Sequence, residues 1–166
     1  MYLELETERL LIRPIHLDDA SFILKLVNSQ GWLEFIGDRK INTEIEATAY
    51  IQKILDQPDY YYSVYQLKET LEPMGLVTFL KRDHLDAPDI GFAMLPNYEG
   101  KGYAYEASKK YLEEISKLKT YTTILAITRF DNQKSKRLLE KLGMYFQTEY
   151  KNDSEVIHVY SIKGSK

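Results

Sequence analysis

The chain contains no cysteine, which removes several kinds of chemistry at once. Without thiols it can form no disulfide, build no thiolate metal site and use no cysteine nucleophile. Three histidines, His16, His84 and His158, stand alone and lack the spacing of a metal motif. We therefore expect neither a metal centre nor covalent thiol chemistry.

Long apolar runs and massed basic residues are also missing. No apolar stretch approaches the roughly 18 residues that span a bilayer, and the acidic first residues include no signal-peptide core. The net charge is −3 and the basic residues are spread along the chain, which argues against a nucleic acid as the main ligand. We expect a cytoplasmic protein that binds neither membrane nor nucleic acid.

What the chain does contain is typical of a globular α/β protein. With 166 residues, 44% hydrophobic and 28% charged, and with no linker or repeat, we expect residues 1–166 to form a single domain. Asp18 and Asp19 are expected to open the first helix, and Asp131 to cap the last one. Periodicity predicts further helices over 32–36, from Asn42 or Thr43 to about 55, and over 102–118. It predicts strands over 9–15, 60–67, 74–81, 89–95, 122–128, 144–150 and 155–162.

The order of these elements limits the fold. Three successive strands between residues 60 and 95 form a meander, whereas strands and helices alternate after them. This arrangement favours a mixed sheet with helices on both faces over a doubly wound parallel sheet.

The most informative segment joins a predicted strand to a predicted helix through a loop with two glycines, Gly100 and Gly102. The first backbone N–H groups of a helix lack internal partners and carry positive potential, so they suit an anionic diphosphate. Tyr105 stands where a dinucleotide fingerprint needs its third glycine, and no Walker pattern follows. A tight turn without a ligand would use the same glycines, so the loop alone leaves both readings open.

Three separated motifs resemble one family. The loop NYEGKG resembles the cofactor loop of the GNAT acetyltransferase superfamily, Q/R-x-x-G-x-G/A, with Asn97 in place of Gln or Arg. The opening LETERLLIRPIHLDDA and residues 128–144, TRFDNQKSKRLLEKLGM, resemble the ribosomal-protein (RimJ/RimL-type) branch of that superfamily. The resemblance covers nearly the whole chain and implies a GNAT-type mixed, mostly antiparallel sheet with a splayed parallel strand pair.

The resemblance also implies the cofactor, acetyl-CoA, and where it binds. Its diphosphate would lie on the glycine loop, and its pantetheine arm would pair with the free edge of the strand before the loop. The implied cofactor-binding residues are Phe92, Ala93, Met94, Leu95, Asn97, Tyr98, Glu99, Gly100, Lys101, Gly102, Tyr103, Ala104, Asn132 and Ser135.

The implied reaction is attack of a neutral amine on the acetyl thioester, which needs a proton acceptor and stabilisation of the developing oxyanion. Asp89, at the start of the splayed strand, is the candidate base, although it can equally be a solvated carboxylate at a strand end. The backbone N–H of Met94 is the candidate oxyanion donor. The tyrosine acid of many relatives is absent, because Leu139 occupies its position. Ser135 is the alternative donor to the leaving thiolate, or a small residue bonded to its own helix.

Four residues are candidates for shaping the acceptor pocket: Trp32, Glu34, Phe35 and, a second time, Phe92. Each can equally serve packing or the surface. The resulting prediction is an N-acetyltransferase, monomeric or homodimeric, acting on a protein N-terminus or a small-molecule amine. The acidic character of the chain favours a cationic acceptor. Two alternatives stay open: an idle acetyl-CoA-binding regulatory module, and a structural domain whose glycine loop is only a turn.

Overall fold

A computed structural model describes residues 2–164 and shows one eight-stranded mixed sheet. The strand order is β1-β2-β3-β4-β5-β6-β8-β7, and every neighbouring pair is antiparallel except β5 and β6. This confirms the predicted fold class. The strands are β1 (Leu5–Glu6), β2 (Leu10–Pro14), β3 (Tyr60–Leu67), β4 (Pro73–Leu80), β5 (Asp89–Met94), β6 (Thr123–Arg129), β7 (Tyr145–Asn152) and β8 (Glu155–Lys163).

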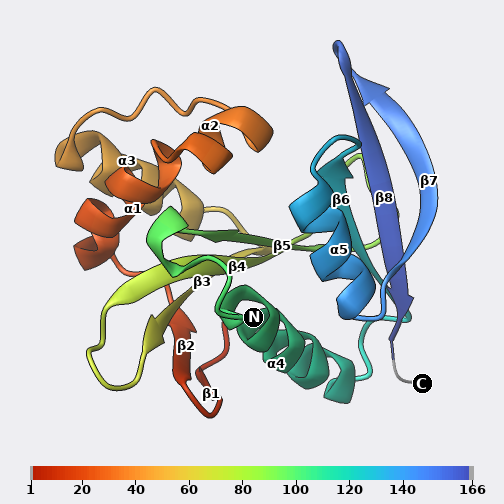
Figure 1. Ribbon diagram of the computed structural model, residues 1–166, viewed down its shortest axis with the longest axis horizontal. Coiled ribbons are helices and arrows are strands. Elements are labelled where there is room, and N and C mark those ends of the chain that lie inside the picture. Colours follow the sequence, from red (N-terminus) through yellow and green to blue (C-terminus); the bar gives the residue numbers. More distant parts are fainter. Residues whose placement is uncertain (1, 165–166) are drawn as a thin grey trace.

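Helices cover both faces of the sheet (Figure 1). Helices α1 and α3 pack on one face through a core that includes Ile23 and Ile51, whereas α4 packs on the other face through Ala107 and Tyr111. Within the described residues no helix is long and apolar enough to cross a membrane. The helices are η1 (Leu17–Asp19), α1 (Ala20–Val27), α2 (Gln30–Phe35), α3 (Glu44–Leu55), η2 (Pro96–Tyr98), α4 (Tyr103–Lys117) and α5 (Gln133–Lys141).

The local sequence explains where the helices begin. Thr43 caps α3 by accepting a hydrogen bond from the Glu46 N–H, while the Glu46 carboxylate accepts from the Thr43 N–H. The predicted cap of α5 was wrong: Asn132, not Asp131, accepts the hydrogen bond of the first turn. Asp131 is not available because Arg129 binds both of its oxygens.

Two other predictions needed correction. Helix α2 begins at Gln30, two residues before the predicted start, and the short strand β1 was not predicted at all. β1 has only two residues, too few to show an alternating pattern. It pairs with β2 through Leu5 opposite Ile12, and so forms the outer edge of the sheet beside the start of α4.

The sheet is divided between β5 and β6. These parallel strands have a single paired position, Asp89 opposite Leu125, supported by the bond from the Leu125 N–H to the Pro88 carbonyl at 2.9 Å. Beyond it the strands diverge, and Figure 1 shows β6, β8 and β7 standing apart from the strands that lie between α1–α3 and α4. The predicted splayed pair is therefore present, and it places the glycine loop and α5 on opposite sides of the divide.

Candidate functional site

The glycine loop connects β5 to α4 with a backbone that only glycine adopts without strain. Gly100 and Gly102 have φ of +77° and +80°, in the left-handed region. A Cβ built on Gly100 meets no atom within 4 Å, and one on Gly102 meets only Arg9 Nη2, at 3.6 Å. Protein atoms therefore leave space beside these two backbones, which suits the close approach of a ligand.

The start of α4 supplies hydrogen-bond donors beside that space. Gly102 is the N-cap, and the first N–H that returns to it belongs to Glu106. The preceding N–H groups, from Tyr103 onward, have no partner inside the helix, and the helix dipole adds positive potential there. The loop thus combines left-handed glycines with N–H groups that have no partner inside the helix, and its binding of a diphosphate stays a prediction. Tyr98, by contrast, is buried in the core and anchors the loop.

The strand β5 presents a free backbone edge to the divide. The Leu95 N–H donates to the Met74 carbonyl at 2.8 Å, so Leu95 and Ala93 turn their amide groups toward β4. By strand alternation the N–H and C=O groups of Phe92 and Met94 point the other way, toward β6, which has already diverged. They have no strand partner among the described residues, which leaves them available to an amide-containing arm.

The opposite side of the divide is the start of α5. The Asn132 side-chain oxygen accepts from the Ser135 N–H at 3.1 Å, which leaves the Asn132 amide NH₂ free to donate. The Ser135 hydroxyl has no hydrogen bond in the described part of the chain, so the bond to its own helix is not observed. The Lys134 ammonium reaches back to Glu99 of the loop at 2.7 Å and links the two sides.

Asp89 lies at the closed end of the divide and is only 1% exposed. It shares a face of β5 with Ala93, which packs against the α1–α3 core, so its carboxylate points to that side of the sheet. Arg82 Nε donates to Asp89 Oδ1 at 2.8 Å. The reading of Asp89 as a solvated strand-end carboxylate was therefore wrong, because the side chain is buried and paired.

Burial raises the pKa of Asp89, and the charge and hydrogen bond of Arg82 oppose that rise. The charge of His84 also favours the ionised carboxylate. Arg82 is itself surrounded by phenolic groups, and the pKa of neighbouring Tyr62 is raised by burial. The residue has the low-dielectric surroundings and the specific charge partner that are common among catalytic acids and bases.

A groove of about 780 Å³ opens on the same face, beside this pair. Its lining includes Leu125, the residue paired with Asp89, and also His84 and Tyr150, whose ring centres are 6.1 Å apart. The connection between β4 and β5 forms one wall, and β7 forms the other. Asp89 itself does not line the groove and stays buried beside it.

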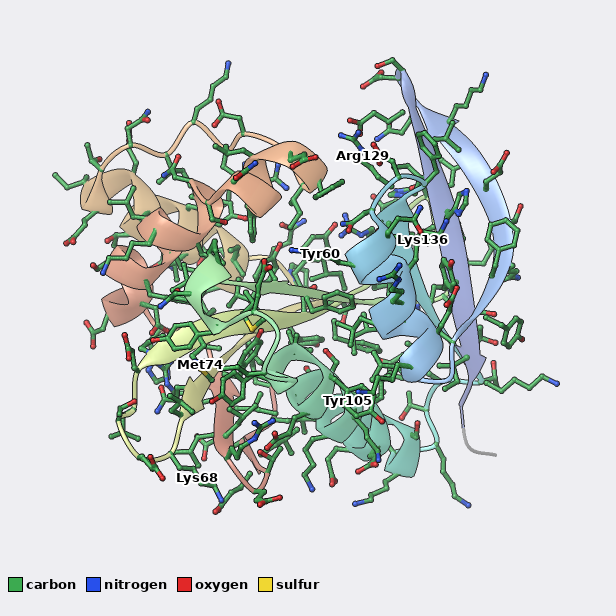
Figure 2. The ribbon with its side chains drawn as sticks, viewed as in Figure 1. Tyr60, Lys68, Met74, Tyr105, Arg129 and Lys136 are labelled. Carbon is green, nitrogen blue, oxygen red and sulfur yellow. The ribbon has the colours of Figure 1, made fainter. Side chains whose placement is uncertain are left out.

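The four residues predicted to shape an acceptor pocket separate in the structure. Trp32 is buried in the α1–α3 core, and Phe92 faces α4. Glu34 and Phe35 lie near the end of β6, where Arg129 Nη1 donates to the Glu34 carbonyl at 2.7 Å and the guanidinium lies 5.5 Å from the Phe35 ring. Figure 2 shows Arg129 in this position between α2 and β6.

Sequence reasoning missed Arg82, Arg129 and the pair of Arg9 with Glu106 beside the glycine loop. No motif marks Arg82, which follows a strand in a turn-rich segment. Arg9 stands in the opening motif, which was interpreted only as a strand and a family signature. Within residues 2–164 no group of three His, Cys, Asp or Glu side chains is arranged to hold a metal ion.

Comparison with known proteins gives consistent matches. The family "Acetyltransferase (GNAT) domain" matches residues 9–145. The chain is similar to YnaD of Bacillus subtilis, an uncharacterized N-acetyltransferase, with 28% identity over 86% of this chain and 82% of YnaD. The fold is similar to a ribosomal-protein-S5-alanine acetyltransferase of Vibrio fischeri, with a TM-score of 0.81, 19% identity and coverage of 98% and 97%. It is also similar to a spermidine N-acetyltransferase of Vibrio cholerae in complex with CoA and spermine, with a TM-score of 0.79, 16% identity and coverage of 95% and 97%.

The environment of Asp89 predicts its titration. Its pKa is expected above the ordinary aspartate value of about 3.9, whereas that of Asp131, which Arg129 lowers through its hydrogen bonds, is expected below it. Arg82→Met should raise the pKa of Asp89 further, because the opposing charge is lost. Carboxyl-carbon NMR titration measures the pKa of Asp89 and of Asp131 in the parent protein, and the pKa of Asp89 in Arg82→Met.

The sign of the linkage follows from the raised pKa. Because the folded state binds the Asp89 proton more tightly, this group favours folding at acidic pH, and that contribution is lost as the pH rises through the folded-state value. An Asp89 midpoint at or below 3.9, about the unperturbed value, would show that Arg82 outweighs burial.

Proposed function

The chain belongs to the GNAT acetyltransferase family, and we propose that it transfers the acetyl group of acetyl-CoA to a primary amine. The observation that carries this proposal is the juxtaposition of a glycine cradle at the start of α4 with the free edge of β5, at a divide closed by Asp89. In the same proposal residues 1–166 act as one catalytic domain.

The cofactor would be held by three parts of the chain. The N–H groups of Gly102, Tyr103 and Ala104 would bind the diphosphate, because they stand at the start of α4, where backbone N–H groups have no partner inside the helix. On the edge of β5, the N–H and C=O of Phe92 and the C=O of Met94 would pair with the amides of the pantetheine arm. The free NH₂ group of Asn132 would donate to the same arm from the α5 side. Lys101 and Lys134 would add attraction by charge.

When bound, acetyl-CoA supplies an activated acetyl group and a thiolate leaving group. Asp89 would accept the proton of the incoming ammonium, directly or through a water molecule. Its raised pKa makes it a stronger base than an ordinary aspartate. The Met94 N–H, which faces the divide, would donate to the thioester oxygen. Ser135, whose hydroxyl is free, would donate to the departing sulfur.

The acceptor would approach on the α1–α3 face, since the Asp89 carboxylate points to that side and the groove lies next to it. The similar Vibrio proteins are named for two different acceptors, a ribosomal-protein alanine and spermidine. A protein N-terminus, as in the RimJ/RimL-type branch, and a small cationic amine therefore both remain candidate acceptors. A panel of amines and N-terminal peptides, with released thiol as the readout, separates them.

The cradle makes a prediction for cofactor binding. Gly102→Ala should weaken CoA binding by at least about tenfold, because the added Cβ enters the cradle and strains a left-handed backbone. Gly143→Ala is the matched control, since Gly143 has a similar φ of +84° but lies after α5. It should lose comparable stability while binding CoA normally. Calorimetry with CoA and thermal unfolding measure the two effects; equal CoA affinity in both variants would place the site elsewhere.

The catalytic role of Asp89 makes a second prediction. Asp89→Asn should lower kcat/KM by roughly 100-fold or more while CoA affinity is retained. Asp19→Asn is the control, because Asp19 is also buried and paired with an arginine, Arg13, but lies at the start of α1. Steady-state kinetics with the best amine of the panel compare them. Full activity in Asp89→Asn would assign proton removal to another group.

A further inference from the structure

A cluster of polar contacts joins the N-terminal segment to the glycine loop. Arg9 Nε donates to Glu106 Oε2 at 2.7 Å, and Arg9 Nη2 lies 2.6 Å from the same oxygen. The Arg9 N–H and the Thr7 hydroxyl donate to Glu106 Oε1 at 3.0 and 2.6 Å. Arg9 Nη1 donates to the Lys101 carbonyl at 3.0 Å. We call these contacts the Arg9 clamp.

The clamp reaches the cradle through the peptide bond between Lys101 and Gly102. Peptide bonds in the described chain are all trans, so the Lys101 C=O and the Gly102 N–H point in opposite directions. By holding the Lys101 oxygen, Arg9 directs the Gly102 N–H to the other side of the loop. Without this contact the peptide between Lys101 and Gly102 could rotate, because glycine tolerates many backbone conformations. The direction of the Gly102 N–H would then no longer be fixed.

The clamp also controls charge at the start of α4. Glu106 lies in the first turn of the helix, close to where the diphosphate would bind. Burial alone would raise the pKa of Glu106, but hydrogen bonds from Thr7 and Arg9 lower it, so the carboxylate stays ionised. An ionised carboxylate there repels a diphosphate unless a cation neutralises it. Arg9 supplies that cation and covers the Tyr103 ring, with its guanidinium 4.4 Å from the ring centre.

We propose that Arg9 is a positioning residue for the cofactor's diphosphate, which aims the Gly102 N–H and neutralises Glu106. This inference rests on the proposed function. It gives the opening Thr7-Glu8-Arg9 segment a role at a site almost a hundred residues away in sequence.

The first test compares Arg9, which lies just before β2, with Arg13, which lies within β2. Arg9→Met should weaken CoA binding by about tenfold, and Arg9→Lys should recover only part of it, since an ammonium keeps the charge but cannot span both partners. Arg13→Met is the matched control, because Arg13 forms a similar fork with Asp19, with both oxygens at 2.8 Å, away from the loop. It should bind CoA like the parent. Calorimetry with CoA gives the affinities, and thermal unfolding shows that each variant folds.

The second test separates positioning from simple stabilisation. Adding Glu106→Gln to Arg9→Met should restore part of the CoA affinity, because the repelling carboxylate is gone even though more native contacts are lost. The deficit of Arg9→Met should also shrink as salt is raised, since salt screens that repulsion. A purely structural role predicts a double variant no better than the single one.

The outcomes distinguish this inference from its premise. If the parent protein does not bind CoA, the proposed function fails. If the parent binds CoA and folded Arg9→Met binds it equally well, the clamp has no positioning role. If Arg9→Met does not fold, Arg9→Lys and Glu106→Gln give the same comparison against Arg13→Lys, and unchanged affinity in both would overturn the inference.

Discussion

The single paired position between β5 and β6 is the constraint on which the rest of the site depends. Asp89 and Leu125 hold the two halves of the sheet together, and the strands diverge beyond them. Divergence leaves the β5 edge at Phe92 and Met94 without a strand partner, a cost that proteins avoid unless something else satisfies those groups. The same divergence sets the start of α4 and the start of α5 apart. One local feature of the sheet therefore leaves the β5 edge free and separates the glycine loop from the start of α5.

The site also depends on how charge is placed around that divide. Acidic groups lie close to where an anionic cofactor would bind, and each has a cationic partner: Glu106 with Arg9, and Glu99 with Lys134. On the other face, the partly exposed Arg82 pairs with the buried Asp89. Burying a charged carboxylate is costly unless it is paired, so these arginines make the acidic positions tolerable. The arginines also fix the orientation of these carboxylates, whereas a solvated carboxylate is free to rotate.

Much of this arrangement follows from patterns that are local in the sequence. The strand, glycine loop and helix around Gly100 and Gly102 were predicted because turn residues and helical periodicity are short-range signals. The family resemblance supplied the splayed strands, which periodicity cannot show. The burial of Asp89 and its ion pair with Arg82 were missed because only the tertiary structure brings them about. The Arg9 clamp was missed for the same reason, as it joins residues far apart in the chain.

The most direct measurement of the central claim is an amide NMR titration of the parent protein with CoA. We expect the largest shift changes at the loop and the start of α4, around Gly100 to Ala104, and at Phe92 and Met94 on the β5 edge. The amide signals of residues around Asn132, on the α5 side of the divide, should also shift. Shift changes confined to the groove near His84 and Tyr150, with the loop unaffected, would contradict the assignment of the cradle as the cofactor site.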